Sequence, residues 1–219
     1  GNADAQIDPE VEATEFVTQR ILMRRERQFI TDAFAGSIWG TTTTPGTLWD
    51  NAASDPEADV DVAKDTILQN TGYEANTMVI GYQVFQALKR NPSIGDRLKY
   101  TTPDAPTEAF LANFFGVDRL FVGKTVYNSA VEGATTSMSF AYGKHALLLH
   151  VAPRPALRTP SAGYTFSWRN GVSQGNGLDV GIRNFRMEDL DADRIEGKAA
   201  FDHKIVATDL GYFLESVIS

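Results

Sequence analysis

A helical pattern of apolar positions occupies the N-terminal part of the chain. Asp8, Pro9 and Glu10 indicate a helix start, because aspartate caps a first turn, proline fits the first helical position and glutamate favours the positive end of the helix dipole. Apolar residues then recur at helical spacing: Leu22, Phe29, Ile30, Ala33 and Phe34. Three arginines fall on another side: Arg20, Arg24 and Arg27. The pattern predicts one long amphipathic helix from about Pro9 to Ala35.

A segment without helical period separates this helix from the next one. It contains the run Thr41–Gly46, whose proline and glycine break regular structure, so we interpret the run as a connector between two bodies and a candidate domain boundary. Ser54–Glu57 then predicts a capping box with proline in the first turn, and Gly72 predicts the end of that helix. Four residues make up its predicted apolar face: Val60, Ala63, Ile67 and Leu68.

The middle of the chain alternates between strand and helix signals. Met78–Ile80 is a short apolar run closed by Gly81 and predicts a strand, and Tyr82–Lys89 predicts a helix that Pro92 stops. The following elements are predicted in order: a loop over 100–107, a helix over 110–115 closed by Gly116, and extended chain over 119–124 and 126–127.

The C-terminal part of the chain has a mostly β pattern. Ala146–Leu149 is an apolar run suited to a buried strand, and the three prolines of 152–160 exclude regular structure there. Further strands are predicted over 164–168, 179–186, 199–208 and 212–217, joined by glycine-rich or acidic turns. The order of elements therefore predicts an α+β protein.

Composition narrows the function classes. The chain has 219 residues, of which 42% are hydrophobic and 22% charged, and this balance is typical of a folded protein. A net charge of -8 repels phosphate, and no run of five or more lysines and arginines offsets it, so sequence-specific nucleic-acid binding is disfavoured. A protein that only encloses nucleic acid needs no such affinity. The absence of cysteine excludes disulfides, thiolate metal sites and cysteine nucleophiles.

The hydropathy of the sequence predicts no membrane association. No apolar run approaches the ~20 residues that span a bilayer, and Gly1–Glu10 lacks the basic and apolar regions of a signal peptide. The sequence begins Gly-Asn-Ala-Asp without a methionine, from which we expect that an upstream segment is missing.

One motif suggests catalysis. Gly171–Gly175 matches the G-x-S-x-G elbow of serine hydrolases around Ser173, and Asp191, Asp193 and His203 follow in the order that such enzymes use. An elbow requires a helix directly after the serine, whereas Asn176 and Gly177 followed by alternating apolar residues predict a turn into another strand. A serine hydrolase therefore stays a minor alternative, and we expect no catalytic residue.

The other polar clusters favour structural roles. His145 and His150 are expected to be hydrogen-bonded strand residues, and His203 a solvated one, rather than metal ligands. The acidic residues Asp55, Glu57, Asp59 and Asp61 lack the spacing of a calcium loop and are explained by the helix dipole. Asp189, Asp191 and Asp193 predict an acidic turn, with a divalent-ion site at a subunit contact as a second interpretation. We therefore expect no metal site and no cofactor.

An ordered set of motifs carries a resemblance to a known family. From the connector to the third helix the motifs are Trp49-Asp50, Ser54-Asp55-Pro56, Thr71-Gly72, Asn76-Thr77-Met78-Val79-Ile80-Gly81 and Asn91-Pro92. The set continues with Leu111–Gly116, Leu120–Gly123, Val126–Asn128, Ala146–His150, Pro160-Ser161, Tyr164–Trp168 and Asp209–Tyr212. In this order they resemble tailed-phage major capsid proteins, and they cover nearly all of the chain from Trp49 onward.

The resemblance implies a Hong Kong 97-type fold with a spine helix, a peripheral domain and an axial domain. On it, residues 1–50 are the spine helix and connector of the peripheral domain, 51–155 the axial domain, and 156–219 the β-rich completion of the peripheral domain. The N-terminal arm and extended loop that the family has before the spine helix are expected to be absent from this chain.

The resemblance also implies a structural function. The implied protein assembles with itself into pentamers and hexamers of an icosahedral phage head that encloses DNA, in the virion, after assembly in the host cytoplasm. Its implied partners are a portal, a scaffold or maturation protease and decoration proteins, with no membrane. An encapsulin-like bacterial compartment shell is the alternative with the same fold.

Overall fold

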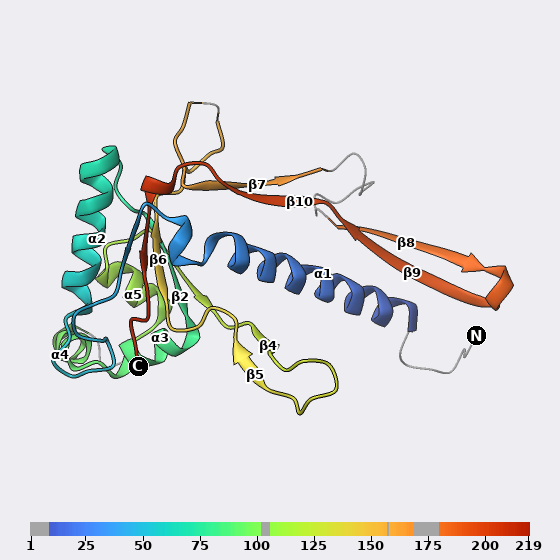
Figure 1. Cartoon of the computed structure of the whole chain (residues 1–219), viewed down its shortest axis with the longest axis horizontal. Coiled ribbons are helices and arrows are strands. Elements are labelled where there is room, and N and C mark those ends of the chain that lie inside the picture. The colour runs from blue at the N-terminus through green and yellow to red at the C-terminus, as the bar shows by residue number, and fades with distance from the viewer. Residues whose placement is uncertain (1–8, 102–105, 157, 169–179) are drawn as a thin grey trace. The chain divides into compact units, whose positions relative to one another are not determined.

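The computed structural model, shown in Figure 1, describes residues 9–101, 106–156, 158–168 and 180–219. The chain divides into two compact units. Unit 1 consists of residues 1–29 and 165–204, and unit 2 of residues 30–164 and 205–219. The last strand of the chain lies in the sheet of unit 2, and the domain ranges 1–50, 51–155 and 156–219 stay a prediction.

A five-stranded mixed sheet forms the centre of unit 2. Its strand order is β1-β11-β6-β2-β3, with bounds β1 (Thr41–Thr43), β2 (Thr77–Gly81), β3 (Arg119–Gly123), β6 (Ala146–Leu149) and β11 (Gly211–Leu214). Strand β6 runs antiparallel to both β2 and β11, while β1 is parallel to β11 and β3 is parallel to β2. Every residue of β2, β6 and β11 is buried, which explains their continuous apolar runs in the sequence.

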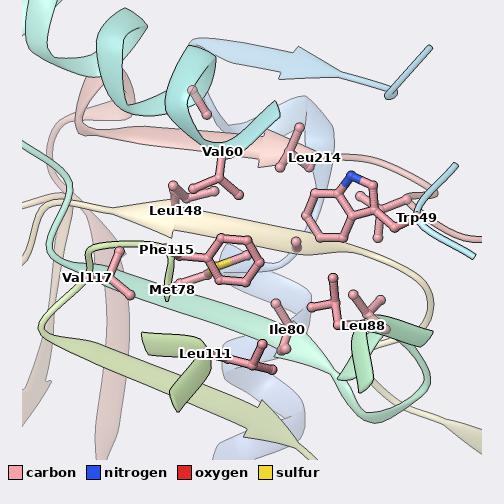
Figure 2. Close-up of a cluster of buried hydrophobic side chains, with 14 of the residues drawn as sticks. Trp49, Val60, Met78, Ile80, Leu88, Leu111, Phe115, Val117, Leu148 and Leu214 are labelled. Carbon is pink, nitrogen blue, oxygen red and sulfur yellow. The ribbon is translucent and has the colours of Figure 1, made fainter. Parts of the chain in front are cut away.

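Helices of unit 2 bury their apolar faces in the main hydrophobic core. The helices are α2 (Pro56–Thr71), α3 (Tyr82–Arg90), α4 (Pro92–Thr101) and α5 (Glu108–Phe114). Figure 2 shows side chains of this core, in which Trp49 stacks on Phe115 with 6.5 Å between ring centroids and Leu148 of β6 lies nearby. The core is therefore built from segments far apart in the sequence.

Aromatic residues cover the other face of the sheet. Phe34 makes edge-to-face contacts with Tyr142 and Phe213, with ring centroids 5.1 and 5.4 Å apart. The indole Nε1 of Trp39 donates a hydrogen bond to the carbonyl of Ala33 at 2.7 Å. The four aromatic side chains and Ala33 are all buried. The centre of the sheet is therefore covered on both faces.

Unit 1 combines most of helix α1 (Pro9–Ala33) with the hairpin of β8 (Val180–Met187) and β9 (Ala192–Ala199). The two strands pair over their full length, from Val180 opposite Ala199 to Met187 opposite Ala192, and a short 3-10 helix joins them. A methyl group added to Gly197 would clash with Val17 and Ile21 of α1, so this glycine lets the helix lie against the hairpin (Figure 1).

Two further strand pairs complete the described chain. Strand β7 (Gly163–Ser167) pairs with β10 (Phe201–Ile205), and β4 (Val126–Asn128) pairs with β5 (Met138–Phe140) in a hairpin of unit 2. Two 3-10 helices lie in unit 2, at Gly36–Ile38 and Thr208–Leu210.

Two helix ends confirm their sequence signals, with one change of residue. Gly72 ends α2 in the left-handed conformation with a φ of 76°, and its N–H donates to the carbonyl of Leu68 at 2.8 Å. At the other end of α2 the cap is Asp55, whose carboxylate accepts from the N–H of Ala58 at 3.3 Å. Ser54 of the predicted capping box is buried instead and bonds elsewhere.

Several predictions were wrong. Thr41–Thr43 is an edge strand that pairs with β11, so the run predicted as a connector belongs to the sheet. Helix α4 was missed, since the loop predicted over 100–107 begins inside it. The 187–198 segment, predicted mainly as a turn, contains β9. Leu22 and Leu68, placed on apolar helix faces, are 47% and 46% exposed.

Candidate assembly surfaces

The expected partners of a catalytic serine are bound to other residues. Asp191 and Asp193 both form ion pairs with Arg186, the second at 3.5 Å. The Nε2 of His203 donates to the carbonyl of Arg25 at 3.2 Å, and its Nδ1 bonds with the hydroxyl of Thr165 at 2.9 Å. Both ring nitrogens are therefore occupied by structural bonds. The Gly171–Gly175 motif itself lies outside the described residues.

The other two histidines adjoin the ends of β6 and hold backbone segments. His150 donates from Nδ1 to the carbonyl of Glu74 at 2.7 Å. His145 accepts at Nδ1 from the N–H of Ser216 at 3.0 Å, so its ring is neutral with the proton on Nε2. Burial lowers the pKa of His145 below its usual value, and the negative charge of Glu215 opposes this effect.

The acidic positions of α2 also have structural bonds. Asp55 caps the helix, and the carboxylate of Asp59 accepts from the indole Nε1 of Trp49 at 2.7 Å. Within the described ranges no group of three or more His, Cys, Asp or Glu side chains could hold a metal ion.

A buried polar network that the sequence analysis missed is centred on Asn91. Its amide Nδ2 donates to the carbonyl of Trp49 at 2.9 Å and to the hydroxyl of Ser54 at 2.8 Å. Its Oδ1 accepts from the N–H of Ser93 at 2.9 Å, which caps the first turn of α4. The dipeptide Asn91-Pro92 is the sequence signal that could have identified both the cap and α4.

A shallow cavity of about 360 Å³ lies beside α3, and the side chains around it do not match any one class of ligand. It lies among Asp50, Gln83, Arg90 and Phe140, with mixed charges and amides around it. The carboxylate of Asp50 accepts bonds from the N–H and the hydroxyl of Ser219, and the hydroxyl bond is the main reason that the pKa of Asp50 is lowered. The strongest acceptor of the cavity is therefore already bound within the chain.

Unit 1 exposes several large apolar side chains. No hydrophobic side chain of unit 1 is fully buried among residues 9–29, 165–168 and 181–204. Its large exposed apolar residues include Phe16 on α1, Trp168 beyond β7 and Leu190 at the hairpin turn, which are 54%, 69% and 68% exposed. Large exposed apolar side chains, where they gather on one face, are typical of a surface that another molecule covers.

Unit 2 also has exposed apolar side chains outside its core. Val62, Leu68 and Tyr73 are exposed on and just after α2, and Phe121 is exposed on the edge strand β3. The β4–β5 hairpin adds Val131 at its turn. Unlike unit 1, unit 2 also has a cluster of fully buried hydrophobic side chains.

Comparison with known proteins identifies the class to which this fold corresponds. None of the helices in the described ranges is sufficiently long and apolar to cross a membrane. The structure superimposes on a crystal structure of a phage-related protein from Bordetella bronchiseptica RB50 with a TM-score of 0.80 and 21% identity, covering 97% of this chain and 69% of that one. An encapsulin complex from Synechococcus elongatus gives a TM-score of 0.60 at 14% identity, covering 100% of this chain and 70% of that one. The predicted Hong Kong 97-like α+β capsid fold is therefore confirmed.

Sequence comparison points to particular proteins within this class. The chain is 27% identical, over 230 aligned positions, to the major capsid protein of Pseudomonas phage JBD67, covering all of this chain and 70% of the phage protein. It is 26% identical over 171 positions to that of Burkholderia phage BcepMu, covering 76% of this chain but only about half, 52%, of that protein. No family model matches the sequence. The predicted resemblance to tailed-phage major capsid proteins is confirmed.

Proposed function

We propose that this protein is a structural subunit of a phage head, which assembles with copies of itself into pentamers and hexamers of a closed icosahedral shell around DNA. The observation that carries this proposal is the similarity of the whole chain to a phage major capsid protein. The composition agrees with it, because an acidic chain can enclose DNA without binding its phosphates tightly. The role is structural rather than enzymatic.

The uncovered surface of unit 1 supports this proposal independently. A unit that buries no hydrophobic side chain completely among its described residues gains stability when a neighbouring copy covers its apolar face. We assign unit 1, with α1 as the spine helix, to the peripheral domain, and the sheet and helices of unit 2 to the axial domain. On this assignment the rings form through heterologous contacts, in which different surfaces of adjacent copies meet.

The remaining features follow from the resemblance to phage capsid proteins. The shell is located in the virion and is assembled in the host cytoplasm. A portal, a scaffold or maturation protease, and decoration proteins are its expected partners. An N-terminal arm and an extended loop before α1 would add further contacts between copies in a longer form of the protein.

Assembly of the purified full-length protein tests the proposal. We expect sedimentation velocity to show species of five or six copies or larger, and electron microscopy to show rings or closed shells. A protein that stays monomeric under all assembly conditions, including those with its scaffold, would contradict the proposal.

The encapsulin-like alternative is favoured only by the likeness to the Synechococcus encapsulin complex. The contents of shells isolated from their natural source separate the two functions. A phage head contains DNA and has a portal at one vertex, whereas a compartment shell contains a cargo protein. Shells that contain one abundant protein and no DNA would replace the phage function with the compartment function.

A further inference from the structure

The outward face of the β8–β9 hairpin is basic and aromatic although the whole chain is acidic. Side chains alternate along each strand, and the face that carries Ile182 and Gly197 lies against α1. The register places two cross-strand pairs on the opposite face: Arg183 with Glu196 and Phe185 with Arg194. Lys198 lies on the same face.

These outward side chains are accessible and preorganised. Phe185 is 41% exposed, and the guanidinium of Arg194 lies 5.6 Å from the centroid of its ring. Lys198 pairs with Glu196 at 3.4 Å, which leaves Arg183 and Arg194 as excess positive charge beside the aromatic ring. The hairpin therefore presents two excess cations around an exposed aromatic ring.

The turn of the same hairpin is acidic and carries one exposed apolar side chain. It consists of Glu188, Asp189, Leu190 and Asp191, all exposed, and Leu190 is the most exposed apolar residue of the hairpin. Asp191 is in the left-handed conformation with a φ of 46°, and it forms an ion pair with Arg186. This turn therefore presents one apolar side chain flanked by carboxylates in a defined backbone conformation.

We propose that the acidic turn of one copy's hairpin docks on the basic outward face of the hairpin of a neighbouring copy. Leu190 then covers Phe185, while Glu188 and Asp189 meet Arg183 and Arg194. The inference rests on the proposed self-assembly and names the surfaces of one contact in it. Because the turn and the face are different surfaces, the contact is heterologous and repeats from copy to copy. Two basic faces repel each other, and so do two acidic turns, so face-to-face and turn-to-turn contacts are disfavoured.

Cysteine cross-linking tests the geometry, because the natural chain contains no cysteine. A chain with both Leu190→Cys and Phe185→Cys is assembled, oxidised mildly and run on a denaturing gel without reductant. We expect covalent multimers from this double variant only, while each single variant stays monomeric, since a heterologous contact joins different residues. Equal cross-linking by a single variant, or none by the double variant in assembled shells, would overturn the proposal.

Charge exchange tests the chemistry of the contact. Reversal of the face (Arg183→Glu with Arg194→Glu) or of the turn (Glu188→Lys with Asp189→Lys) should each raise the protein concentration needed for assembly by about tenfold or more, because attractions between surface charges become repulsions. The chain that carries all four changes should assemble as the natural protein does. The charge-preserving control, Arg183→Lys with Arg194→Lys, should assemble normally.

The outcomes separate this contact from other occupants and from the proposed function. If the basic face binds DNA phosphate or another acidic partner, reversal of the turn does not rescue reversal of the face, and the proposal fails. Shells that form without the cross-link refute the contact but support self-assembly. Cross-linked multimers that never build rings or shells support the contact and refute the capsid function.

Discussion

The two units of this protein differ in how completely they bury their apolar residues. In unit 2 the side chains of Figure 2 fill a core between helices and a sheet, and the three central strands of that sheet are buried on both faces. In unit 1 the hairpin lies against α1 where Gly197 approaches Val17 and Ile21, and no hydrophobic side chain of the described residues is fully buried. The difference shows that unit 2 packs a core of its own, whereas no hydrophobic side chain of unit 1 is fully buried among its described residues, as the proposed cover by neighbouring copies would require.

Replacing one leucine by alanine in each unit should give the largest difference in the free energy of unfolding. Leu148→Ala removes a fully buried side chain of unit 2 and should lower the free energy of unfolding by about 2–5 kcal/mol. Leu190→Ala at the exposed turn of unit 1 should change it by less than about 0.5 kcal/mol. Denaturant unfolding of unassembled protein, followed by circular dichroism so that the helices and strands of both units are observed, measures both. Similar losses in the two variants would remove the distinction between the units.

A second change targets the narrow contact inside unit 1. Gly197→Val forces side-chain atoms into Val17 and Ile21, and should destabilise the helix–hairpin contact by about 1–3 kcal/mol. Hydrogen exchange should show faster opening of residues 9–29 and of β8–β9, with unit 2 unchanged. Gly46→Val is the matched control, since no atom lies within 4 Å of the place that a Cβ would take there, and it should leave the exchange of unit 1 unaltered. Faster exchange in unit 2 as well would indicate that the two units are coupled.

Removal of the N-terminal cap of α2 should have a smaller effect on the stability of unit 2. Asp55→Ala removes the acceptor for the N–H of Ala58 and should cost about 1 kcal/mol of unfolding free energy. Asp61→Ala, an exposed position of the same helix, should cost less than about 0.5 kcal/mol. Thermal unfolding followed by circular dichroism compares the two, and equal losses would mean that the capping bond contributes nothing.

The smallest expected effect is a pH dependence at His145. Because its pKa is lower in the folded protein than the unfolded value of about 6.5, the unfolded chain takes up the proton first as the pH falls. The stability that the neutral ring contributes is therefore fully present above about pH 6.5 and is lost as the pH falls from that value through the lower pKa of the folded protein.

The variant His145→Gln isolates this contribution, since glutamine cannot titrate but can still accept from the N–H of Ser216. Melting temperatures measured between pH 7.5 and pH 5 should fall more steeply for the natural protein than for the variant. Parallel curves for the two proteins would show that His145 has the same pKa in both states.

The contrast between the units also explains what the sequence could predict. Met78–Ile80 and Ala146–Leu149 are central strands covered on both faces, so continuous apolar runs mark them. Strand β9 is part of a two-stranded ribbon without such cover, and its charged residues Asp193, Arg194, Glu196 and Lys198 resemble a turn. The pattern that predicts strands is therefore strongest where burial is greatest.

Other misses arise from contacts between distant segments. Thr41–Thr43 has no strand pattern of its own and becomes a strand because β11, at the other end of the chain, pairs with it. The network of Asn91 with Trp49 and Ser54 likewise joins two distant segments, the loop before α2 and the start of α4, through buried bonds. Leu22 and Leu68 are apolar at helical spacing but face outward, because spacing alone does not say which apolar residues the fold leaves exposed.

Hydrogen exchange compared between unassembled and assembled protein tests the central claim most directly. If neighbouring copies cover unit 1, the amides of α1 within residues 9–29 and of the β8–β9 hairpin should become at least about tenfold more protected on assembly, while those of β2 and β6 in unit 2 stay as they are. Equal protection of unit 1 in both states, in a preparation that contains shells, would contradict the account.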